Sequence, residues 1–372
     1  MYLKYLTLSN FKNIEQADLD CSPVLNCFVG NNGEGKTNLL DGIYYLSMCR
    51  SKFVSSDSIN IRNSEDYFLL KGKYVRMNES LDEDCASCGV KRSGRKSFKY
   101  NSKEYRKLSD HIGVVPLVFI TPSDNAMITD GSEERRKFLN TLISQTDKVY
   151  LDSLLRYNNV LMNRNKHLKN SRNIPVDLSL METMNHHLNH YGSIVYEKRR
   201  EMVETLLPLF RQIYSAIANN KEEIDIAYRS DLDQNDLTTL LDRNFERDRI
   251  LQYTSTGIHR DDLLLEIDGR SLKNSGSQGQ QKTFIIAMKI AQFSIIKNNT
   301  GLSPILLLDD IFDKLDVERV ERLISFVTGN GFGQIFLTDS NKNRLDRLLQ
   351  KNSTDYKLFS VEAGNVKLIQ SS

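Results

Sequence analysis

The chain has 372 residues, of which 40% are hydrophobic and 26% charged, and its formal net charge is +2. This composition is that of an ordinary globular protein, and the near-neutral charge excludes binding of nucleic acid through an overall basic field. The length allows two or three domains, and no apolar run approaches the roughly 20 residues of a membrane-spanning helix. The N-terminus lacks a signal peptide and the five cysteines are scattered, so we expect reduced thiols and a cytoplasmic location.

The first thirty residues predict three strands, at 2–8, 14–20 and 25–29, and a glycine-rich segment follows the third. Residues 30–37 read Gly-Asn-Asn-Gly-Glu-Gly-Lys-Thr and fit the phosphate-binding loop pattern G-x-x-x-x-G-K-[ST], here between a strand and a helix. Lys36 is expected to reach the β- and γ-phosphates of ATP, and the Thr37 hydroxyl to hold Mg²⁺. The residues expected to bind the nucleotide here are Gly30, Asn31, Asn32, Gly33, Glu34, Gly35, Lys36, Thr37 and Asn38.

Residues 67–70, 72–77 and 97–100 predict strands of an antiparallel sheet beside the nucleotide core, with a turn or loop at 78–88. Residues 114–120 predict a buried strand. From 132 to 245 glycine is scarce and apolar residues recur at helical spacing, which indicates a helical insertion. A break at 170–175 predicts an antiparallel helical hairpin.

Strand patterns return at 225–228, 263–267, 306–308 and 335–338, so the parallel α/β core resumes after the insertion. The predicted organisation is a first ATPase part at 1–130, an inserted helical arm at 131–248 and a second ATPase part at 249–372.

Residues 305–310 form an apolar strand that ends in two acids, as a Walker B element does. Asp309 is expected to bind the Mg²⁺ shell, and Asp310 to act on the attacking water, either as general base or by positioning it. The alternative interpretation is an ordinary strand that ends in a solvated acidic turn. The presence of a phosphate-binding loop in the same chain favours the Walker B interpretation over it.

A second anion-binding pattern occurs at Asn274–Lys282, where a Ser-Gly-rich turn opens a helix predicted from 280 to 297. One triphosphate does not need two such sites, so we interpret Ser277, Gly279 and Gln280 as contacts to nucleotide bound by another protomer. Ser277 as a simple N-cap is the alternative.

Together these segments resemble the bacterial RecF family, relatives of the SMC and SMC-like repair ATPases. Gly276–Gln280 resembles the signature motif of ABC-type ATPases and Asp313–Asp316 their D-loop. Further similar segments are Asn10–Asn13, Pro122–Leu139, Leu161–Asn165 and Gly257–Leu263. The chain departs from the family pattern at Ser132, Asn140 and Asp313-Lys314, and Asp310 replaces the glutamate usual in ABC proteins.

The resemblance implies an α/β fold with an ABC-type P-loop ATPase core, an antiparallel β-subdomain and an inserted α-helical arm. It implies an ATP-driven homodimer that binds double-stranded DNA and gap junctions in replication, recombinational repair and the SOS response. The partners implied are RecR, RecO and the RecA recombinase. Because aspartate is shorter than glutamate, we expect Asp310 to give slow hydrolysis, which favours a switch over a motor. The expected activity is a weak, DNA-stimulated ATPase.

Three basic clusters could contact DNA phosphates. The first lies at Lys91–Lys107 and includes Lys91, Arg92, Arg95 and Lys96. The second lies at the arm tip and includes Arg164, Lys166, His167, Lys169 and Arg172. The third is Lys198–Arg200. A solvated face is an equally good interpretation of any single cluster.

Three rival functions stay open: a transporter's nucleotide-binding subunit, an ATPase–nuclease fusion and a DNA-binding module with a vestigial ATP site. Cys85 and Cys88 have the spacing of half a zinc site, but no second pair accompanies them, so we interpret them as free thiols. His186, His187 and His190 share a helix face and are interpreted as surface or packing residues.

Overall fold

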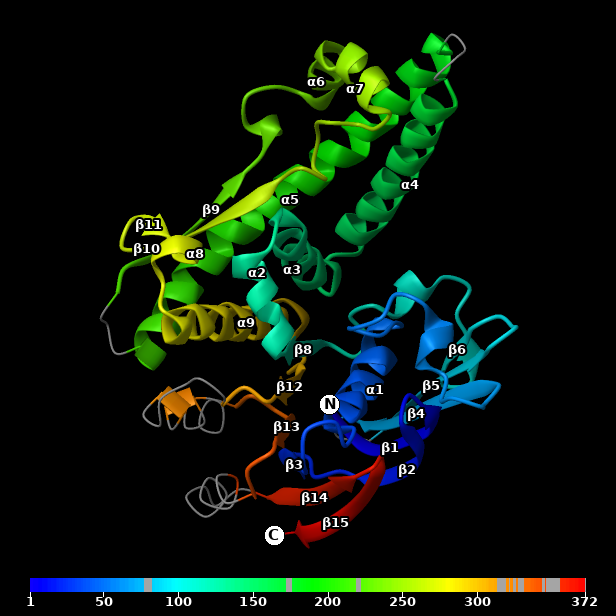
Figure 1. Ribbon diagram of the computed structural model, residues 1–372, viewed down its shortest axis with the longest axis vertical. Coiled ribbons are helices and arrows are strands. Elements are labelled where there is room, and N and C mark those ends of the chain that lie inside the picture. The colour runs from blue at the N-terminus through cyan, green and yellow to red at the C-terminus, as the bar shows by residue number, and fades with distance from the viewer. Residues whose placement is uncertain are drawn as a thin grey trace. The chain divides into compact units, whose positions relative to one another are not determined.

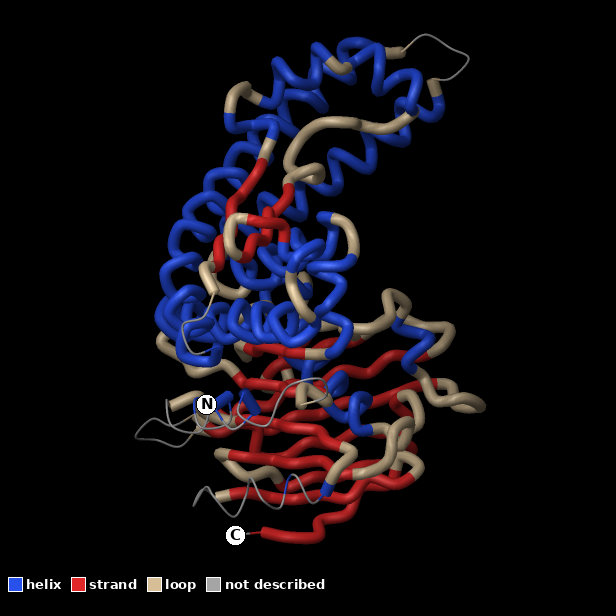
Figure 2. Tube along the Cα trace, turned by 60° about the vertical axis from the view of Figure 1, so that its left-hand side comes forward, coloured by secondary structure: helices blue, strands red, loops and turns tan. Residues whose placement is uncertain are grey.

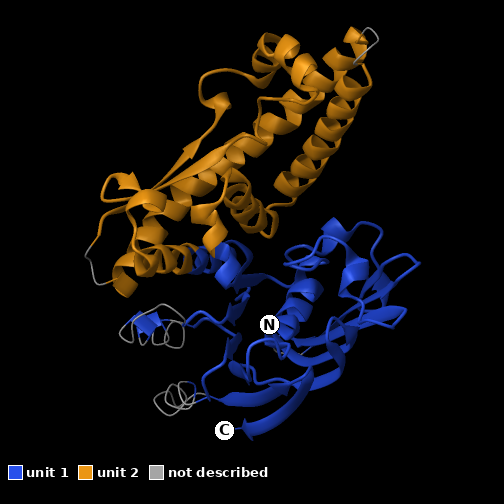
Figure 3. Ribbon diagram, in the orientation of Figure 1, with its two compact units in different colours: residues 1–124, 289–372 blue, residues 125–288 orange. Residues whose placement is uncertain are grey.

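The computed structural model describes residues 1–76, 82–171, 176–218, 222–312, 319–320, 322–323, 326, 331–342, 345 and 355–371. Contacts divide the chain into two compact units (Figure 3). Unit 1 comprises residues 1–124 and 289–372, and unit 2 comprises residues 125–288.

Unit 1 contains a six-stranded antiparallel sheet (Figure 1). Its strands, in spatial order, are β2 (Ile14–Asp20), β1 (Tyr2–Phe11), β4 (Tyr67–Val75), β5 (Glu83–Lys91), β6 (Ser97–Tyr100) and β7 (Lys103–Glu104). Alternate side chains such as Leu6 and Leu70 are fully buried. The sheet therefore has one core face and one solvent face, as antiparallel sheets commonly do.

Two details of this sheet differ from the prediction. Residues 67–75 form one strand rather than two, and the predicted loop at 78–88 is wrong from Glu83 onward, where β5 begins. The sequence of β5 did not indicate a strand because three of its four buried positions, Asp84, Ala86 and Cys88, are not typical strand residues, and only Val90 is. Residues 77–81 lie outside the described part.

A second sheet of unit 1 supports the nucleotide site. Its strands, in spatial order, are β15 (Asn365–Ser371), β14 (Tyr356–Glu362), β3 (Leu25–Val29), β13 (Ile335–Asp339), β12 (Ile305–Asp309) and β8 (Leu117–Ile120). The strands from β14 to β8 are parallel and β15 is antiparallel to β14. Their carboxyl ends therefore meet at one edge, where open parallel sheets bind ligands.

The prediction of a parallel core is confirmed, but its extent was underestimated. Strands β14 and β15 were not predicted. They follow the predicted strand at 335–338 in the chain and belong to the same sheet. Strand β8 begins only after Pro116, which lacks the N–H that a ladder position needs. Helix α1 (Lys36–Met48) follows β3, and short 3-10 helices lie at Asp57–Asn60, Leu108–His111 and Pro122–Asn125.

Unit 2 is mainly helical, as Figure 2 shows by its blue tubes. Its helices are α2 (Ala126–Thr129), α3 (Ser132–Ser144), α4 (Lys148–Asn170), α5 (Leu178–Ala218), α6 (Leu237–Arg243), α7 (Phe245–Leu251), α8 (Leu272–Ser275) and α9 (Gln278–Thr300), of which α9 continues into unit 1. Its strands β9 (Ile224–Arg229), β10 (Asp262–Ile267) and β11 (Arg270–Ser271) form a small antiparallel sheet, and Asp231–Asp233 is a 3-10 helix. The predicted helical hairpin is formed by α4 and α5, which lie side by side.

The compact units differ from the predicted organisation at the second boundary. Strand β10 pairs with β9, so residues 249–288 group with the helical arm in contacts. The division 1–130, 131–248 and 249–372 stays a proposal about function.

Candidate nucleotide-binding site

The loop Gly30–Thr37 lies between β3 and α1, where two of its glycines meet steric limits. A Cβ on Gly30 would lie 2.2 Å from the backbone oxygen of Val361 in β14. Gly35 has φ +113°, and a Cβ there would lie 2.8 Å from the Asn13 side chain. Such conformations and approaches favour glycine, so the loop's sequence fits its path.

Lys36 opens α1 and is 6% exposed. Its Nζ donates to the backbone oxygens of Gly30, at 2.7 Å, and Asn31, at 2.8 Å, so the ammonium lies across the loop. Burial lowers the pKa of Lys36, and the neighbouring Asp310 and Asp309 oppose that shift. The first-turn N–H groups of α1 and this ammonium are the kinds of donor that bind phosphate, so the arrangement fits the predicted polyphosphate site.

The two predicted metal-binding residues, Thr37 and Asp309, lie next to each other in the structure. The Thr37 hydroxyl lies 3.0 and 2.9 Å from the two carboxylate oxygens of Asp309, at the end of β12. Thr338 in β13 donates to Asp309 at 2.8 Å. Desolvation raises the pKa of Asp309, which is 4% exposed. Hydroxyl and carboxylate oxygens suit Mg²⁺, so this pair fits the expected ion.

Asp310 follows Asp309 in a left-handed conformation, with φ +45°. Its N–H donates to the Thr338 hydroxyl at 3.0 Å, which fixes the backbone where the strand ends. The side chain is half-buried beside the Lys36 ammonium, whose pKa it affects. This position permits either predicted role, as base or as water-positioning group.

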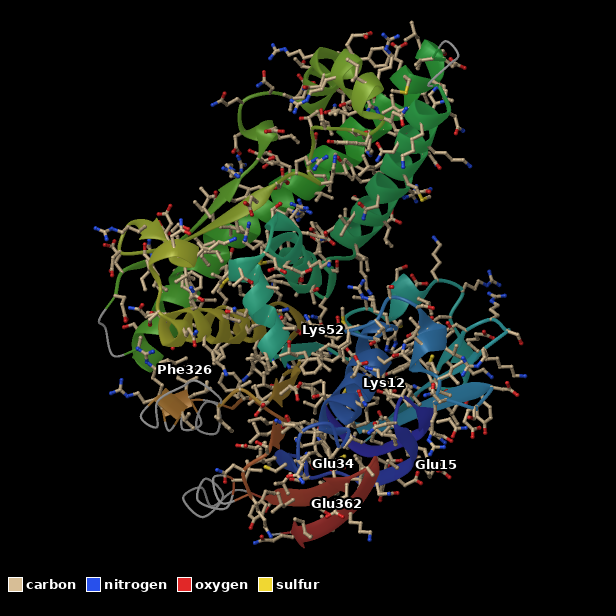
Figure 4. The ribbon with its side chains drawn as sticks, in the orientation of Figure 1. Lys12, Glu15, Glu34, Lys52, Phe326 and Glu362 are labelled. Atoms are coloured by element: carbon tan, nitrogen blue, oxygen red, sulfur yellow. The ribbon has the colours of Figure 1, made fainter. Side chains whose placement is uncertain are left out.

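The outer side of the loop is held by residues that sequence reasoning missed. The backbone oxygen of Glu34 accepts from Asn13 Nδ2 at 3.1 Å and from the Gly364 N–H at 2.8 Å. The Glu34 carboxylate accepts from the Ala363 N–H, and Figure 4 labels Glu34 and Glu362 in this region. Ala363 and Gly364, with φ +49° and +83°, form the turn between β14 and β15. The sequence signal that could have predicted this hairpin is the Ala-Gly pair between two segments in which apolar and polar residues alternate.

The predicted signature residues lie at the start of α9. Ser277 is exposed, and its hydroxyl accepts from the Gln280 N–H at 3.3 Å, while Gln280 Oε1 accepts from the Ser277 N–H at 2.7 Å. This exchange is a helix cap, so the N-cap interpretation describes Ser277 within one chain. It leaves the role toward another protomer's nucleotide as a prediction. The D-loop segment Asp313–Asp316 lies outside the described residues.

The basic clusters are placed very differently. Lys91, Arg92, Arg95, Lys166 and Lys169 are exposed, and Arg92 donates to the backbone oxygen of Glu65. Arg172 lies outside the described residues.

Three other cations of these clusters are occupied inside the protein. Arg164 is 0% exposed and lies 2.8 Å from Asp248, so its assignment to DNA binding is corrected. Lys96 bonds Asp57 at 3.1 Å and is largely covered. In the third cluster Arg199 is buried 2.8 Å from Asp261. A guanidinium paired this way is unavailable to phosphate.

The cysteine pair does not face one space. Cys88 points into the core, where burial raises the pKa of its thiol to about 12, whereas Cys85 lies on the opposite face of β5. Among the described residues no cluster of three metal-binding side chains occurs. No described helix is long and apolar enough to cross a membrane.

Comparisons with known proteins match nearly the whole chain. The family model described as RecF/RecN/SMC N terminal domain matches residues 2–365. The DNA replication and repair protein RecF of Parabacteroides distasonis is 48% identical over 367 residues, which cover 99% of each chain.

Two solved structures extend the comparison. A structure of the recombination mediator protein RecF with ATP, in the RecFOR pathway, superposes with a TM-score of 0.88 at 29% identity and covers 99% of this chain and 98% of that one. The Smc head bound to the C-winged helix domain of ScpA has a TM-score of 0.58 at 15% identity, covers 99% of this chain and 97% of that one, and shows the fold alone.

The predicted ABC-type α/β core with its β-subdomain and helical arm is therefore confirmed, as is the predicted resemblance. With both its loop and its acidic strand end in place and 99% of its length matched, the chain belongs to the RecF family of DNA replication and repair proteins, within the wider RecF/RecN/SMC group of ATPases.

Proposed function

We propose that the chain binds ATP and Mg²⁺ at residues 30–38 together with Asp309, and uses this to control its hold on DNA. The observation that carries the proposal is the network in which Thr37, Asp309 and Thr338 join the loop to the ends of two core strands. Lys36 and the α1 N-terminus would hold the phosphates, and Thr37 and Asp309 the metal ion. The bound ion would neutralise charge on the transferred phosphoryl group.

The active form would be an ATP-dependent homodimer. Ser277 and Gly279 of one copy, with Gln280 beside them, would cap the ATP held by Lys36 of the other. Ser277 is exposed at a helix N-terminus, where N–H groups favour anions. ATP would shift the equilibrium toward the closed dimer by binding it more tightly than the open form.

Hydrolysis would be weak and DNA-stimulated, and would release the dimer. Asp310 is placed beside Lys36, where it would act on the attacking water. The relatively short aspartate side chain supports the proposal of a slow switch rather than a motor.

The ligands would be double-stranded DNA and gap junctions in the cytoplasm. Lys91, Arg92 and Arg95 on the β5–β6 hairpin, and Lys166 and Lys169 on α4, are the exposed cations that would contact phosphates. By family relation, the protein would help load RecA at single-stranded gaps with RecO and RecR, in repair and the SOS response.

The experiment compares the wild-type protein with Lys36→Met for ATP binding, ATP-dependent dimerisation and retention on gapped DNA. The proposal expects all three to fall together. Normal dimerisation and DNA retention in Lys36→Met would overturn it in favour of a DNA-binding module with a vestigial ATP site. Co-purification with membranes and a DNA-independent ATPase would favour a transporter subunit instead.

A further inference from the structure

The solvent face of the six-stranded sheet in unit 1 carries an unusual set of side chains. Tyr5 and Tyr67 are 41% and 47% exposed, on the neighbouring strands β1 and β4. The exposed lysines on this face are Lys71, Lys73, Lys91 and Lys99. Lys91 and Lys99 fall within the basic cluster predicted at Lys91–Lys107, whereas Lys71 and Lys73 were not predicted as part of a binding surface.

The strand register combines these residues in a regular way. Tyr67 stands directly opposite Lys91, and Tyr5 directly opposite Lys73, whose Nζ lies 5.7 Å from the Tyr5 ring centroid. Residues directly opposite on antiparallel strands share a face and lie about 5 Å apart. Each aromatic ring therefore has a lysine directly opposite it, and Tyr5 also has Asp20 opposite it on β2.

The surface between the two pairs carries lysines, small residues and one exposed leucine. Lys71 stands opposite Ser87, which stands opposite Lys99, and exposed Leu69 stands opposite Gly89. Small residues in β5 leave the neighbouring long side chains accessible. Within the described residues no carboxylate lies within ion-pair distance of these four lysines.

The acids of this face lie toward its margins. Asp18 and Asp20 are exposed on the edge strand β2, Glu83 at the start of β5 is paired with Lys4 at 2.8 Å, and Glu104 lies on the edge strand β7, directly opposite Lys99. A face that is only solvated normally mixes both signs across its centre. Here the exposed charged side chains of the central strands β4 and β5 are lysines, except for Glu83 at the start of β5, and this positive centre complements a polyanion.

We propose that this face, defined by Tyr5, Tyr67 and the four lysines, binds single-stranded DNA. Exposed aromatic rings stack on unpaired bases while neighbouring cations follow the phosphates. A duplex presents base edges in its grooves and not the flat faces of its bases. A protein partner fits less well, because interface cores are depleted of lysine.

The proposal rests on the proposed DNA function and deepens it. The face would hold the unpaired strand of a gap, while Arg92, Arg95, Lys166 and Lys169 contact duplex, and Lys91 would contact the strand at the junction between the two. The separate binding of single strands and duplex therefore distinguishes failure of this assignment from failure of the wider function.

The test uses the absence of tryptophan from the chain. A Tyr67→Trp variant carries one indole on the face, and titration with oligo-dT should quench its fluorescence to saturation, whereas a blunt duplex should not. Tyr253→Trp, at an exposed site of unit 2, is the matched control and should respond to neither. No quenching by oligo-dT, or equal quenching by duplex, would overturn the proposal.

Affinities provide the second readout. Tyr67→Ala should weaken oligo-dT binding about tenfold, as loss of one stacked base predicts, and Tyr67→Phe should keep the wild-type affinity. The double variant Lys71→Gln, Lys73→Gln should reduce the slope of the logarithm of the oligo-dT binding constant against the logarithm of the salt concentration by about 0.7 per lysine. Lys367→Gln, at an exposed position on β15, is the control and should leave this slope unchanged. Duplex binding and ATP-dependent dimerisation should be retained in all of them. Equal loss for single strand and duplex, or no loss at all, would contradict the assignment.

Discussion

The phosphate-binding loop and the start of α9 are both glycine-rich turns that open a helix, yet they are built differently. The loop is bonded on every side, by Lys36 to its own carbonyls, by Asp309 from β12 and by Asn13 outside. Ser277 is exposed, and its side chain and backbone bond to Gln280 and Gln281 at the start of the same helix. The difference is between a loop whose conformation is held by several parts of the sheet and a helix end whose exposed groups are held only locally, as the proposed roles in phosphate binding and in capping a partner's nucleotide require.

The largest expected effect follows from the loop. Lys36→Met removes an ammonium expected to make more than one charged hydrogen bond, so ATP affinity should fall on the order of 100-fold. Lys52→Met is the control, because Lys52 pairs with Asp124 away from the loop. Equilibrium binding of a fluorescent ATP analogue measures both. Equal affinities would show that the loop does not hold the phosphates.

Ser277→Asp separates the two interpretations of the α9 start. Aspartate caps helices as well as serine does, so thermal stability should be retained. Its carboxylate would face the partner's triphosphate, so ATP-dependent dimerisation should weaken about tenfold or more, while ATP binding by the monomer persists. Ser275→Asp, also exposed, is the matched control. Unchanged dimerisation would leave Ser277 as a cap alone.

A smaller, pH-dependent effect is expected at the metal site. Because burial raises the pKa of Asp309, this carboxylate takes up a proton at a higher pH than an ordinary aspartate. The Mg²⁺-dependent part of ATP affinity should therefore weaken as the pH falls toward that pKa, and Asp309→Asn or EDTA should remove this part at every pH. Calorimetry at several pH values tests it. A pH dependence that survives in Asp309→Asn would assign it to another group.

The smallest effect concerns the turn outside the loop. Glu34→Ala removes the carboxylate contact to the Ala363 N–H but leaves both contacts to the Glu34 backbone oxygen. ATP affinity should fall a few-fold, by about 1 kcal/mol. Glu362→Ala, exposed in the same hairpin, should have no effect. If the two variants behave alike, the hairpin does not position the loop.

Sequence reasoning worked where chemistry fixes both residue type and spacing. The loop at 30–37 and the acids after 305–308 need particular side chains at the ends of apolar strands, so pattern and structure agree. Sequence reasoning was weaker where a segment becomes a strand because of the strands it pairs with. Strand β5 consists largely of small and polar residues, and β14 and β15 follow a long polar segment. Their strand conformation depends on hydrogen bonds to neighbouring strands, which a local sequence pattern does not reveal.

The basic runs in the sequence did not show which of their cations are exposed and which are buried. Arg95 and Arg164 both stand in basic runs, but the first is exposed and the second bonds Asp248, Thr254 and Asn185 in the interior of unit 2. The carboxylate that neutralises Arg164 is 84 residues away in the chain, so no local pattern identifies it. The same holds for Asn13, whose contacts to Glu34 and Asn38 come from folding.

The central claim is that two copies close on ATP, and the mass of the protein in solution tests it most directly. Light scattering should give a monomer without nucleotide and with ADP, and a dimer with ATP and Mg²⁺. Gapped DNA should strengthen the dimer and Ser277→Asp should prevent it. A monomer under every condition, or a dimer that forms equally without ATP, would contradict the account.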